Sequence, residues 1–309
     1  MIVQVFVLLV GFALLVKGAD WFVEGAASIA KELGIPQLVI GLTIVAMGTS
    51  MPEAAVSITA ALDNNAGITI GNIVGSNILN ILIILGITAV ITTVSIQKST
   101  LYYEIPFMIG ITVLLMIFGI TGSQITFMEG VIFWILFLIY LFYLYWMSKK
   151  GTEQEEENIK EIPVWKCLLL MILGGVMVVK GSDFAVSGAS EIARFFGMSE
   201  RFIGLTIVAF GTSLPELVTS VTAARKGNAG IAIGNIVGSN IFNILFVIGT
   251  TALICSVPFE SKFIIDTIIA ILSGALLWGG TIKKKELRRP CGILMLLGYV
   301  AYFVYLCII

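Results

Sequence analysis

Two glutamates stand in the middle of apolar stretches of this 309-residue chain, each directly after a proline and close to two hydroxyl side chains. Glu53 ends the segment Gly41-Leu-Thr-Ile-Val-Ala-Met-Gly-Thr-Ser-Met-Pro-Glu53, and Glu216 ends the nearly identical segment 204–216. A carboxylate inside an apolar membrane span is costly, and such residues mark ion or proton pathways. Two of them in a repeated setting predict a cation site built from both halves of the chain.

The polar neighbours of each glutamate share one helical face. Ala46, Thr49, Ser50 and Glu53 are spaced i, i+3, i+4 and i+7, which places them on one side of a helix. The same four positions recur 163 residues later as Ala209, Thr212, Ser213 and Glu216. Such a face offers hydroxyl and carboxylate oxygens and no soft ligand, so it suits calcium, sodium or magnesium rather than zinc or copper.

A proline before each glutamate predicts a broken helix at the site. Pro52 has no N–H to donate and clashes with the carbonyl of Gly48 one turn earlier, and Pro215 has the same relation to Gly211. Backbone carbonyls freed in this way become additional ligands where they line a cavity inside the bilayer.

A second motif follows each broken span. The segment Gly71-Asn-Ile-Val-Gly-Ser-Asn-Ile-Leu-Asn80 recurs at 234–243 with one change. Its serine and its last asparagine are spaced i, i+4 and share a face. This spacing adds Ser76, Asn80, Ser239 and Asn243 to the candidate site. The glycines of the motif favour close approach of neighbouring helices.

The charge of the site narrows the choice of ion. Glu53 and Glu216 together carry two negative charges when both are ionised. One Ca²⁺ neutralises them, and so do two or more Na⁺, so competition for the same oxygens would couple the two fluxes. Mg²⁺ is disfavoured because it holds its waters and needs a small octahedral cage.

Composition excludes several functional classes. The chain is 58% hydrophobic and 12% charged, against about 25% charged in soluble domains, which indicates a polytopic membrane protein. Its net charge of -1 gives no basis for nucleic-acid binding, and the absence of histidine removes Ser-His, Cys-His and histidine–zinc chemistry. The four cysteines are scattered in apolar surroundings. We predict that the protein is not an enzyme and that it has no catalytic residue, no cofactor and no protein partner. Its expected partners are the lipid bilayer and the ions that it transports.

Ten apolar stretches are long enough to cross a bilayer. We expect them at 2–30, 36–61, 67–92, 102–121, 125–147, 164–194, 199–224, 229–255, 260–280 and 287–308. Lys17 and Asp20 on the first span, and Lys180 and Asp183 on the sixth, are spaced i, i+3 and are expected to form structural ion pairs.

The two halves of the chain are duplicates. Between 41–80 and 204–243, 29 of 40 residues are identical. Each half holds five spans, and an odd number makes the second half enter the membrane from the opposite side. We therefore predict an all-α membrane protein of ten transmembrane helices in two inverted five-helix repeats. The repeats are residues 1–147, with the first motif region at 41–80, and 164–309, with the second at 204–243, joined by a charged cytosolic linker at 148–163.

The distribution of positive charge predicts the orientation. With the N-terminus outside, only Arg194, Arg201 and Lys262 of the 18 lysines and arginines fall in outside loops, and Lys17 and Lys180 lie within spans. The remainder fall in inside loops, as the positive-inside rule requires. We expect a multi-pass protein of the cell membrane with both termini extracellular.

The GTS-x-PE segments at 48–53 and 211–216, each followed by GN-x-x-GSN, resemble the two α repeats of the cation/Ca²⁺ exchanger superfamily, most closely its sodium/calcium exchanger branch. The resemblance covers nearly the whole chain. It implies Na⁺/Ca²⁺ antiport by alternating access, in which several Na⁺ exchange for one Ca²⁺ and the cycle is electrogenic. It also implies that the first and sixth helices slide against the other eight.

The resemblance further implies which residues bind the ions. The calcium ligands would be Thr49, Glu53, Thr212 and Glu216. The sodium sites would use the same four residues together with Ala46, Ser50, Ser76, Ala209, Ser213 and Ser239, and Asn80 and Asn243 would lie beside the central site. Potassium-dependent relatives carry aspartate where this chain has Asn243, so asparagine is typical of the K⁺-independent pattern.

Three alternatives stay open at this point. In a H⁺/Ca²⁺ antiporter the two glutamates would carry protons, although protons do not need the flanking hydroxyl oxygens. A K⁺-dependent Na⁺/Ca²⁺ exchanger would use the same fold. An ion channel is disfavoured by inverted repeats with a site at the membrane midplane.

Overall fold

A computed structural model of the chain describes residues 1–63, 66–149, 162–198 and 209–308. Within them, eight helical segments are long and apolar enough to cross a membrane, and a bent pair would make a ninth. The single-helix segments are α1 (Ile2–Glu32), α8 (Phe127–Ser148), α9 (Val164–Phe195), α15 (Lys262–Thr281) and α16 (Arg289–Ile308). The composite segments are Ala66–Ile91, Thr100–Gly122 and Ala229–Ile254. Their ends agree with the predicted spans to within two residues.

Each composite segment contains a π-helical turn. Ala66–Ile91 consists of a short 3-10 turn, α5 (Thr69–Leu79), η3 (Asn80–Leu85) and α6 (Gly86–Ile91). Ala229–Ile254 consists of α13 (Ala229–Phe242), η6 (Asn243–Ile248) and α14 (Gly249–Ile254), and Thr100–Gly122 of η4 (Thr100–Glu104) and α7 (Ile105–Gly122). The predicted linker at 148–163 and the start of the predicted seventh span fall mostly outside the described residues.

The bent pair is the second predicted span. Its first part, Gln37–Thr49, joins α2 (Gln37–Ile40), η1 (Gly41–Val45) and α3 (Ala46–Thr49), and its second part is α4 (Met51–Leu62). The two parts meet at Ser50 with a bend of 50°. Pro52 lies in the first turn of α4, where its missing N–H is not needed. The predicted break is therefore confirmed.

The corresponding break recurs in the second half. Helix α11 (Ala209–Thr212) ends before Ser213, and α12 (Leu214–Arg225) begins with Pro215 in its first turn. The backbone angles of Ser213, φ -90° and ψ 3°, match those of Ser50, φ -85° and ψ 7°. The duplicated sequence therefore folds into the same local geometry twice.

Two segments form the centre of the molecule. In their most apolar windows, Ala229–Ile254 is 94% buried and Ala66–Ile91 is 78% buried, whereas the other six unbent segments are 17–33% buried. The outer helices expose large apolar side chains, such as Leu138 and Phe142 on α8. An apolar exterior around a more polar, buried centre is the arrangement expected of a protein that lipid surrounds.

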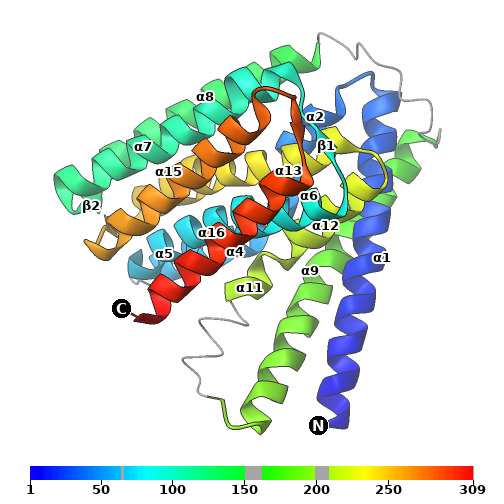
Figure 1. The fold of residues 1–309 in the computed structure, drawn as a ribbon, viewed down its shortest axis with the longest axis horizontal. Helices are drawn as coiled ribbons and strands as arrows, with labels where there is room; N and C mark the ends of the chain where they lie inside the picture. Colours follow the sequence, from blue (N-terminus) through cyan, green and yellow to red (C-terminus); the bar gives the residue numbers. More distant parts are fainter. Residues whose placement is uncertain (64–65, 150–161, 199–208, 309) are drawn as a thin grey trace.

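Helices α1 and α9 lie side by side along one side of the molecule and cross the direction of the other helices (Figure 1). Glycines spaced by seven residues bring their backbones together at Gly11, Gly18 and Gly25 on α1 and Gly174, Gly181 and Gly188 on α9. A Cβ on Gly18 would lie 2.8 Å from the carbonyl oxygen of Gly174, and a Cβ on Gly174 would lie 2.7 Å from that of Gly18. Small residues at such spacing allow close helix packing in membranes.

Ion pairs form within α1 and within α9, and Lys226 connects α1 to the end of α12. The predicted helical pairs form, with Lys17 Nζ 3.3 Å from Asp20 Oδ2 and Lys180 Nζ 3.1 Å from Asp183 Oδ2. Lys226, directly after α12, also places its Nζ 2.5 Å from Asp20 Oδ1. All of these groups are partly exposed, so each pair stabilises the fold by less than about 1 kcal/mol.

Four two-residue strands cross-link the two halves. Strand β1 (Val94–Ser95) pairs antiparallel with β4 (Glu286–Leu287), and β2 (Gln124–Ile125) pairs with β3 (Val257–Pro258). Each pair joins two loops that the predicted topology places on the same side of the membrane.

Candidate ion-binding site

The predicted ligands meet in the buried centre of the molecule. Ten of them are at most 4% exposed: Ala46, Thr49, Ser50, Glu53, Ser76, Asn80, Ser213, Glu216, Ser239 and Asn243. Thr212 is half-buried at the end of α11. The side chain of Ala209 lies outside the described part of the structure. The two helix breaks supply the glutamates and hydroxyls, while α5–η3 and α13–η6 supply the serines and asparagines.

Hydrogen bonds link the two breaks directly. Ser50 Oγ donates to Glu216 Oε1 over 2.8 Å, so a hydroxyl from the first half holds the carboxylate of the second. Ser76 Oγ lies 3.3 Å from Glu53 Oε1 and 3.4 Å from Ser213 Oγ. The two glutamates are therefore held in one buried cluster of hydroxyl side chains, where two ionised carboxylates would repel one another. A cation between them would relieve that repulsion.

Hydroxyl and backbone oxygens extend the donor set. Thr49 Oγ1 has a single hydrogen and three acceptors within 3.3 Å, namely the carbonyls of Val45 and Ala46 and Asn235 Oδ1. Its own lone pairs therefore remain available to an ion. The carbonyl of Ala46 accepts a further hydrogen bond of 3.3 Å from Ser239 Oγ. Hydroxyl, carbonyl and carboxylate oxygens are the ligands that Ca²⁺ and other hard cations take.

Within the candidate site, four buried acceptor oxygens lack a hydrogen-bond partner among the described residues, as do some buried oxygens elsewhere, such as Glu104 Oε2. The four in the site are Glu53 Oε2, Glu216 Oε2, Asn80 Oδ1 and Asn243 Oδ1. All four side chains are 0% exposed. A buried polar atom without a partner is costly, and these four differ from the others in belonging to side chains of the predicted ion site. All four atoms are acceptors, one from each glutamate and one each from Asn80 and Asn243, and a bound cation would satisfy them.

Two asparagines that sequence reasoning did not assign hold the glutamate backbones in place. Asn72 Nδ2 donates to the carbonyl of Glu53 over 3.3 Å and to Ser57 Oγ over 3.0 Å. Asn235 Nδ2 donates to the carbonyl of Glu216 over 3.4 Å and to Ser220 over 2.8 Å. The signal was present, since both asparagines belong to the repeated GN-x-x-GSN motif.

The π-helical turns occur beside the site. Turns η3 and η6 begin at Asn80 and Asn243, and η1 ends immediately before Ala46. Single π turns inside α-helices are rare and are frequent at functional sites, because they shift the direction of the side chains that follow. Turns η3 and η6 occupy equivalent positions in the two halves, which links them to the site rather than to local strain.

The site contains two carboxylates and no softer ligand. The described residues include no group of three or more His, Cys, Asp and Glu side chains that could hold a metal. This fits a site that binds a cation transiently through hydroxyl, amide and carbonyl oxygens better than a tight structural metal centre.

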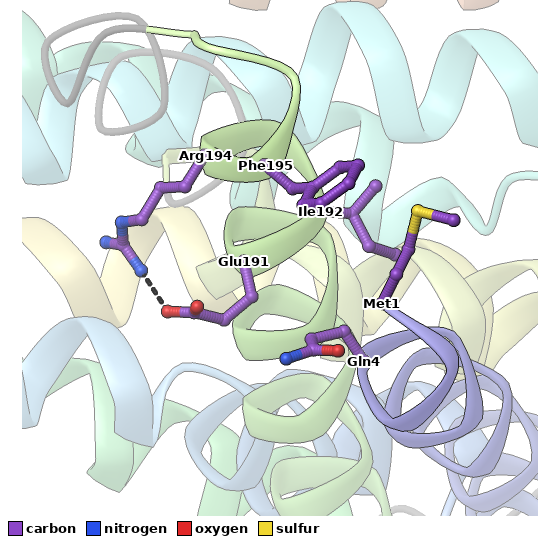
Figure 2. Close-up of a pocket in the computed structure, with 6 residues that line it drawn as sticks. All are labelled: Met1, Gln4, Glu191, Ile192, Arg194 and Phe195. Atoms are coloured by element: carbon purple, nitrogen blue, oxygen red, sulfur yellow. Dashed lines mark hydrogen bonds and ion pairs between the residues drawn. The ribbon is translucent and has the colours of Figure 1, made fainter.

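A separate cavity of about 310 Å³ lies at the N-terminal end of α1 and the C-terminal end of α9 (Figure 2). Glu191 and Arg194 form an ion pair at its edge. The other lining residues are Gln4 and the apolar Met1, Ile192 and Phe195, so the lining is mixed. None of the predicted ion ligands reaches it, so it is not part of the candidate site.

Comparison with known proteins places this arrangement in a family. The family described as sodium/calcium exchanger protein matches residues 3–146 and again residues 166–308. Sodium/calcium exchanger MaX1 of Methanosarcina acetivorans is 33% identical, with 98% of each chain covered. Inner membrane protein YrbG of Escherichia coli K12 is 31% identical, over 99% of this chain and 97% of that protein.

Solved structures show the same relationship. A structure of the sodium-calcium exchanger NCX_Mj superimposes with a TM-score of 0.86 at 34% identity, covering 99% of both chains. Sequence and fold therefore agree over essentially the whole length, including both halves that supply the buried glutamates. The chain belongs to the sodium/calcium exchanger family, and it is a transporter rather than an enzyme.

Proposed function

We propose that this protein is an electrogenic, K⁺-independent Na⁺/Ca²⁺ antiporter. The observation that carries the proposal is the set of four buried acceptor oxygens without a partner, contributed equally by Glu53, Asn80, Glu216 and Asn243. With both glutamates ionised, the site carries two negative charges, which one Ca²⁺ balances. Two or more Na⁺ would compete for the same oxygens, so calcium and sodium would occupy the site alternately.

The individual ligand roles follow the predicted assignment. Thr49, Glu53, Thr212 and Glu216 would bind Ca²⁺, and the sodium sites would use the same residues with the neighbouring serines and the carbonyls of Ala46 and Ala209. The contact between Ser50 and Glu216 supports a site shared by both halves. Asn80 and Asn243 would border the central position.

Alternating access is proposed to arise from ten helices in two inverted repeats. The contact of Gly18 with Gly174 recurs at the equivalent positions as a contact of Gly181 with Gly11, which supports a two-fold relation between the halves. The crossed pairing of β1 with β4 and of β2 with β3 supports it as well. Helices α1 and α9 pack closely on one another and are the elements proposed to slide. The expected location is the cell membrane, with both termini outside.

Calcium uptake into proteoliposomes tests the proposal. Vesicles loaded with Na⁺ are diluted into Na⁺-free medium containing radioactive Ca²⁺, with or without K⁺. We expect uptake that requires the outward Na⁺ gradient, ignores K⁺ and accelerates when the interior is made positive, because more than two Na⁺ leave for each Ca²⁺ that enters. Uptake driven by a pH gradient without Na⁺ would identify a H⁺/Ca²⁺ antiporter, and flux without any counter-ion would indicate a channel.

Asn243→Asp is expected to change cation selectivity. The substitution adds a third carboxylate to a site that Glu53 and Glu216 already charge, and it replaces the amide that donates 3.1 Å to Asn77 Oδ1. Additional negative charge favours an additional monovalent cation, so we expect calcium uptake to become sensitive to K⁺. The same proteoliposome assay checks this, and an unchanged dependence on Na⁺ and K⁺ would place Asn243 outside the site.

A further inference from the structure

Four asparagines form a continuous hydrogen-bond network between the two central segments, in the order Asn80, Asn240, Asn77 and Asn243. Asn77 Nδ2 donates to the backbone carbonyl of Asn240 over 3.2 Å, and Asn240 Nδ2 donates to the backbone carbonyl of Asn77 over 3.1 Å. Asn80 Nδ2 donates 2.9 Å to Asn240 Oδ1, and Asn243 Nδ2 donates 3.1 Å to Asn77 Oδ1. All four side chains are at most 3% exposed. We call Asn77 and Asn240 the inner pair, and Asn80 and Asn243 the outer pair.

The asparagine network determines which end of each outer amide remains available to an ion. An amide side chain has a donor end and an acceptor end. The inner pair uses both ends, one on a backbone carbonyl and one on an outer amide. Each outer asparagine donates an amide hydrogen to the network, and Asn80 Oδ1 and Asn243 Oδ1 have no partner. If either outer amide rotated by half a turn, its oxygen would face the oxygen of its inner partner, and its N–H groups would face the ions.

Each outer asparagine lies on the same helical face as a predicted sodium ligand. Asn80 follows Ser76 by four residues, and Asn243 follows Ser239 by four residues, so each outer oxygen belongs to the same face as a predicted sodium ligand. The inner pair has no such unpaired atom. The amide oxygen and nitrogen of Asn77 and Asn240 all take part in the network, whose bonds cross from one half of the chain to the other.

We propose that Asn77 and Asn240 are positioning residues that fix the outer amides with their oxygens toward the ions. The proposal rests on the proposed function, because it explains how the exchange site presents four acceptors to a cation and no competing donor. It also explains why the outer positions are neutral here. Each must donate a hydrogen to the amide oxygen of an inner asparagine, which an ionised aspartate cannot do.

The crossed connectivity gives the proposal its test. Asn77 acts on Asn243, and Asn240 acts on Asn80, although each inner residue is closer in sequence to the other outer residue. Calcium binding to the purified full-length protein, in Na⁺-free buffer with radioactive Ca²⁺, would be measured for Asn77→Leu, Asn240→Leu, Asn80→Leu, Asn243→Leu and the four inner–outer double variants. Partners that orient a metal ligand typically change affinity by about 10- to 100-fold, and we expect each inner substitution to weaken Ca²⁺ binding by about that factor.

The expected result is coupling only within the crossed pairs. Asn77→Leu should have no further effect once Asn243→Leu is present, because its target is already gone, but it should add fully to Asn80→Leu. Asn240→Leu should show the opposite pattern. A general loss of packing would instead lower affinity equally in both backgrounds, and that outcome, or wild-type affinity in Asn77→Leu, would overturn the proposal.

Two further measurements distinguish a loss of the positioning role from misfolding of a variant and from failure of the proposed transport function. Thermal unfolding and gel filtration identify variants that do not fold, and the smaller, polar Asn77→Ser and Asn240→Ser variants then replace the leucine variants in the same comparison. Sodium-driven calcium uptake by the wild-type protein tests the proposed function independently. Uptake without crossed coupling would reject only the positioning role, whereas absence of sodium-driven uptake would reject the exchanger itself.

Discussion

Glu53→Gln and Glu216→Gln are each expected to abolish sodium-driven calcium uptake while leaving the fold intact. Both side chains are 0% exposed, and each has one oxygen bonded to a serine and one without a partner. Glutamine keeps the size of the side chain but removes one of two negative charges and brings N–H donors to a site made of acceptors. A Ca²⁺ ion would then keep an uncompensated positive charge in a buried environment, which is strongly unfavourable.

The size of the effect follows from direct ligation. Residues that merely orient a ligand change metal affinity by about 10- to 100-fold, so loss of a charged ligand should reduce calcium affinity by more than about 100-fold. The measurement is radioactive calcium uptake into Na⁺-loaded proteoliposomes, with equilibrium calcium binding to the same purified variants.

Glu104→Gln is the matched control for both substitutions. Glu104 is a glutamate of η4 that is 1% exposed, but its hydrogen bond is to Tyr143 on α8 and not to a residue of the candidate site. The isosteric substitution there removes a buried charge without touching the ions, so uptake close to wild type is expected. Equal losses at Glu104 and Glu53 would mean that any buried carboxylate matters, and near-normal uptake in Glu53→Gln would reject the site.

Sequence reasoning located the site because its signals are local. The break at Ser50 follows from Gly48 and Pro52, which act within one helical turn, and the shared face of Thr49 and Glu53 follows from helical periodicity. The predicted ligands in the described part of the structure accordingly lie together in the buried centre. Duplication strengthened the prediction, because every feature of the first half could be compared with its counterpart in the second.

The contacts between the halves could not be read from the chain in the same way. Asn77 pairs with Asn240 across 163 residues, and no periodicity within one helix indicates that partnership. Whether an asparagine presents its oxygen or its nitrogen to the site depends on such partners. The glycines at seven-residue spacing on α1 and α9 are different, since their pattern is local and could have been used to predict close packing of these two helices.

Gly238→Val is expected to disrupt the site by forcing two central elements apart. Gly238 lies on α13, and a Cβ there would be 2.8 Å from the Cβ of Ala46, from the Cα of Leu42 and from the carbonyl oxygen of Leu42. Two of these atoms belong to the backbone and the third, the Cβ of Ala46, is bonded directly to it, so none of them can turn away. Overpacking of this kind typically destabilises a core by about 1–3 kcal/mol.

The displacement would act on ion binding as well as on stability. Ser239, the next residue along α13, donates 3.3 Å to the carbonyl of Ala46, which is a proposed sodium ligand. Separating α13 from α3 would lengthen that contact and move Ser239 away from the facing half of the site. We therefore expect a lower unfolding temperature together with a loss of sodium-driven calcium uptake.

Gly110→Val separates the effect of crowding from that of the substitution itself. Gly110 lies within α7 on an exposed face, and a Cβ there meets no atom of the described residues within 4 Å. Both substitutions put a β-branched side chain into a membrane helix, so they share its intrinsic conformational cost. Thermal unfolding and calcium uptake should both remain near wild type in Gly110→Val. If Gly238→Val behaves like Gly110→Val, the close approach of α13 to the first half is not what holds the two halves of the site together.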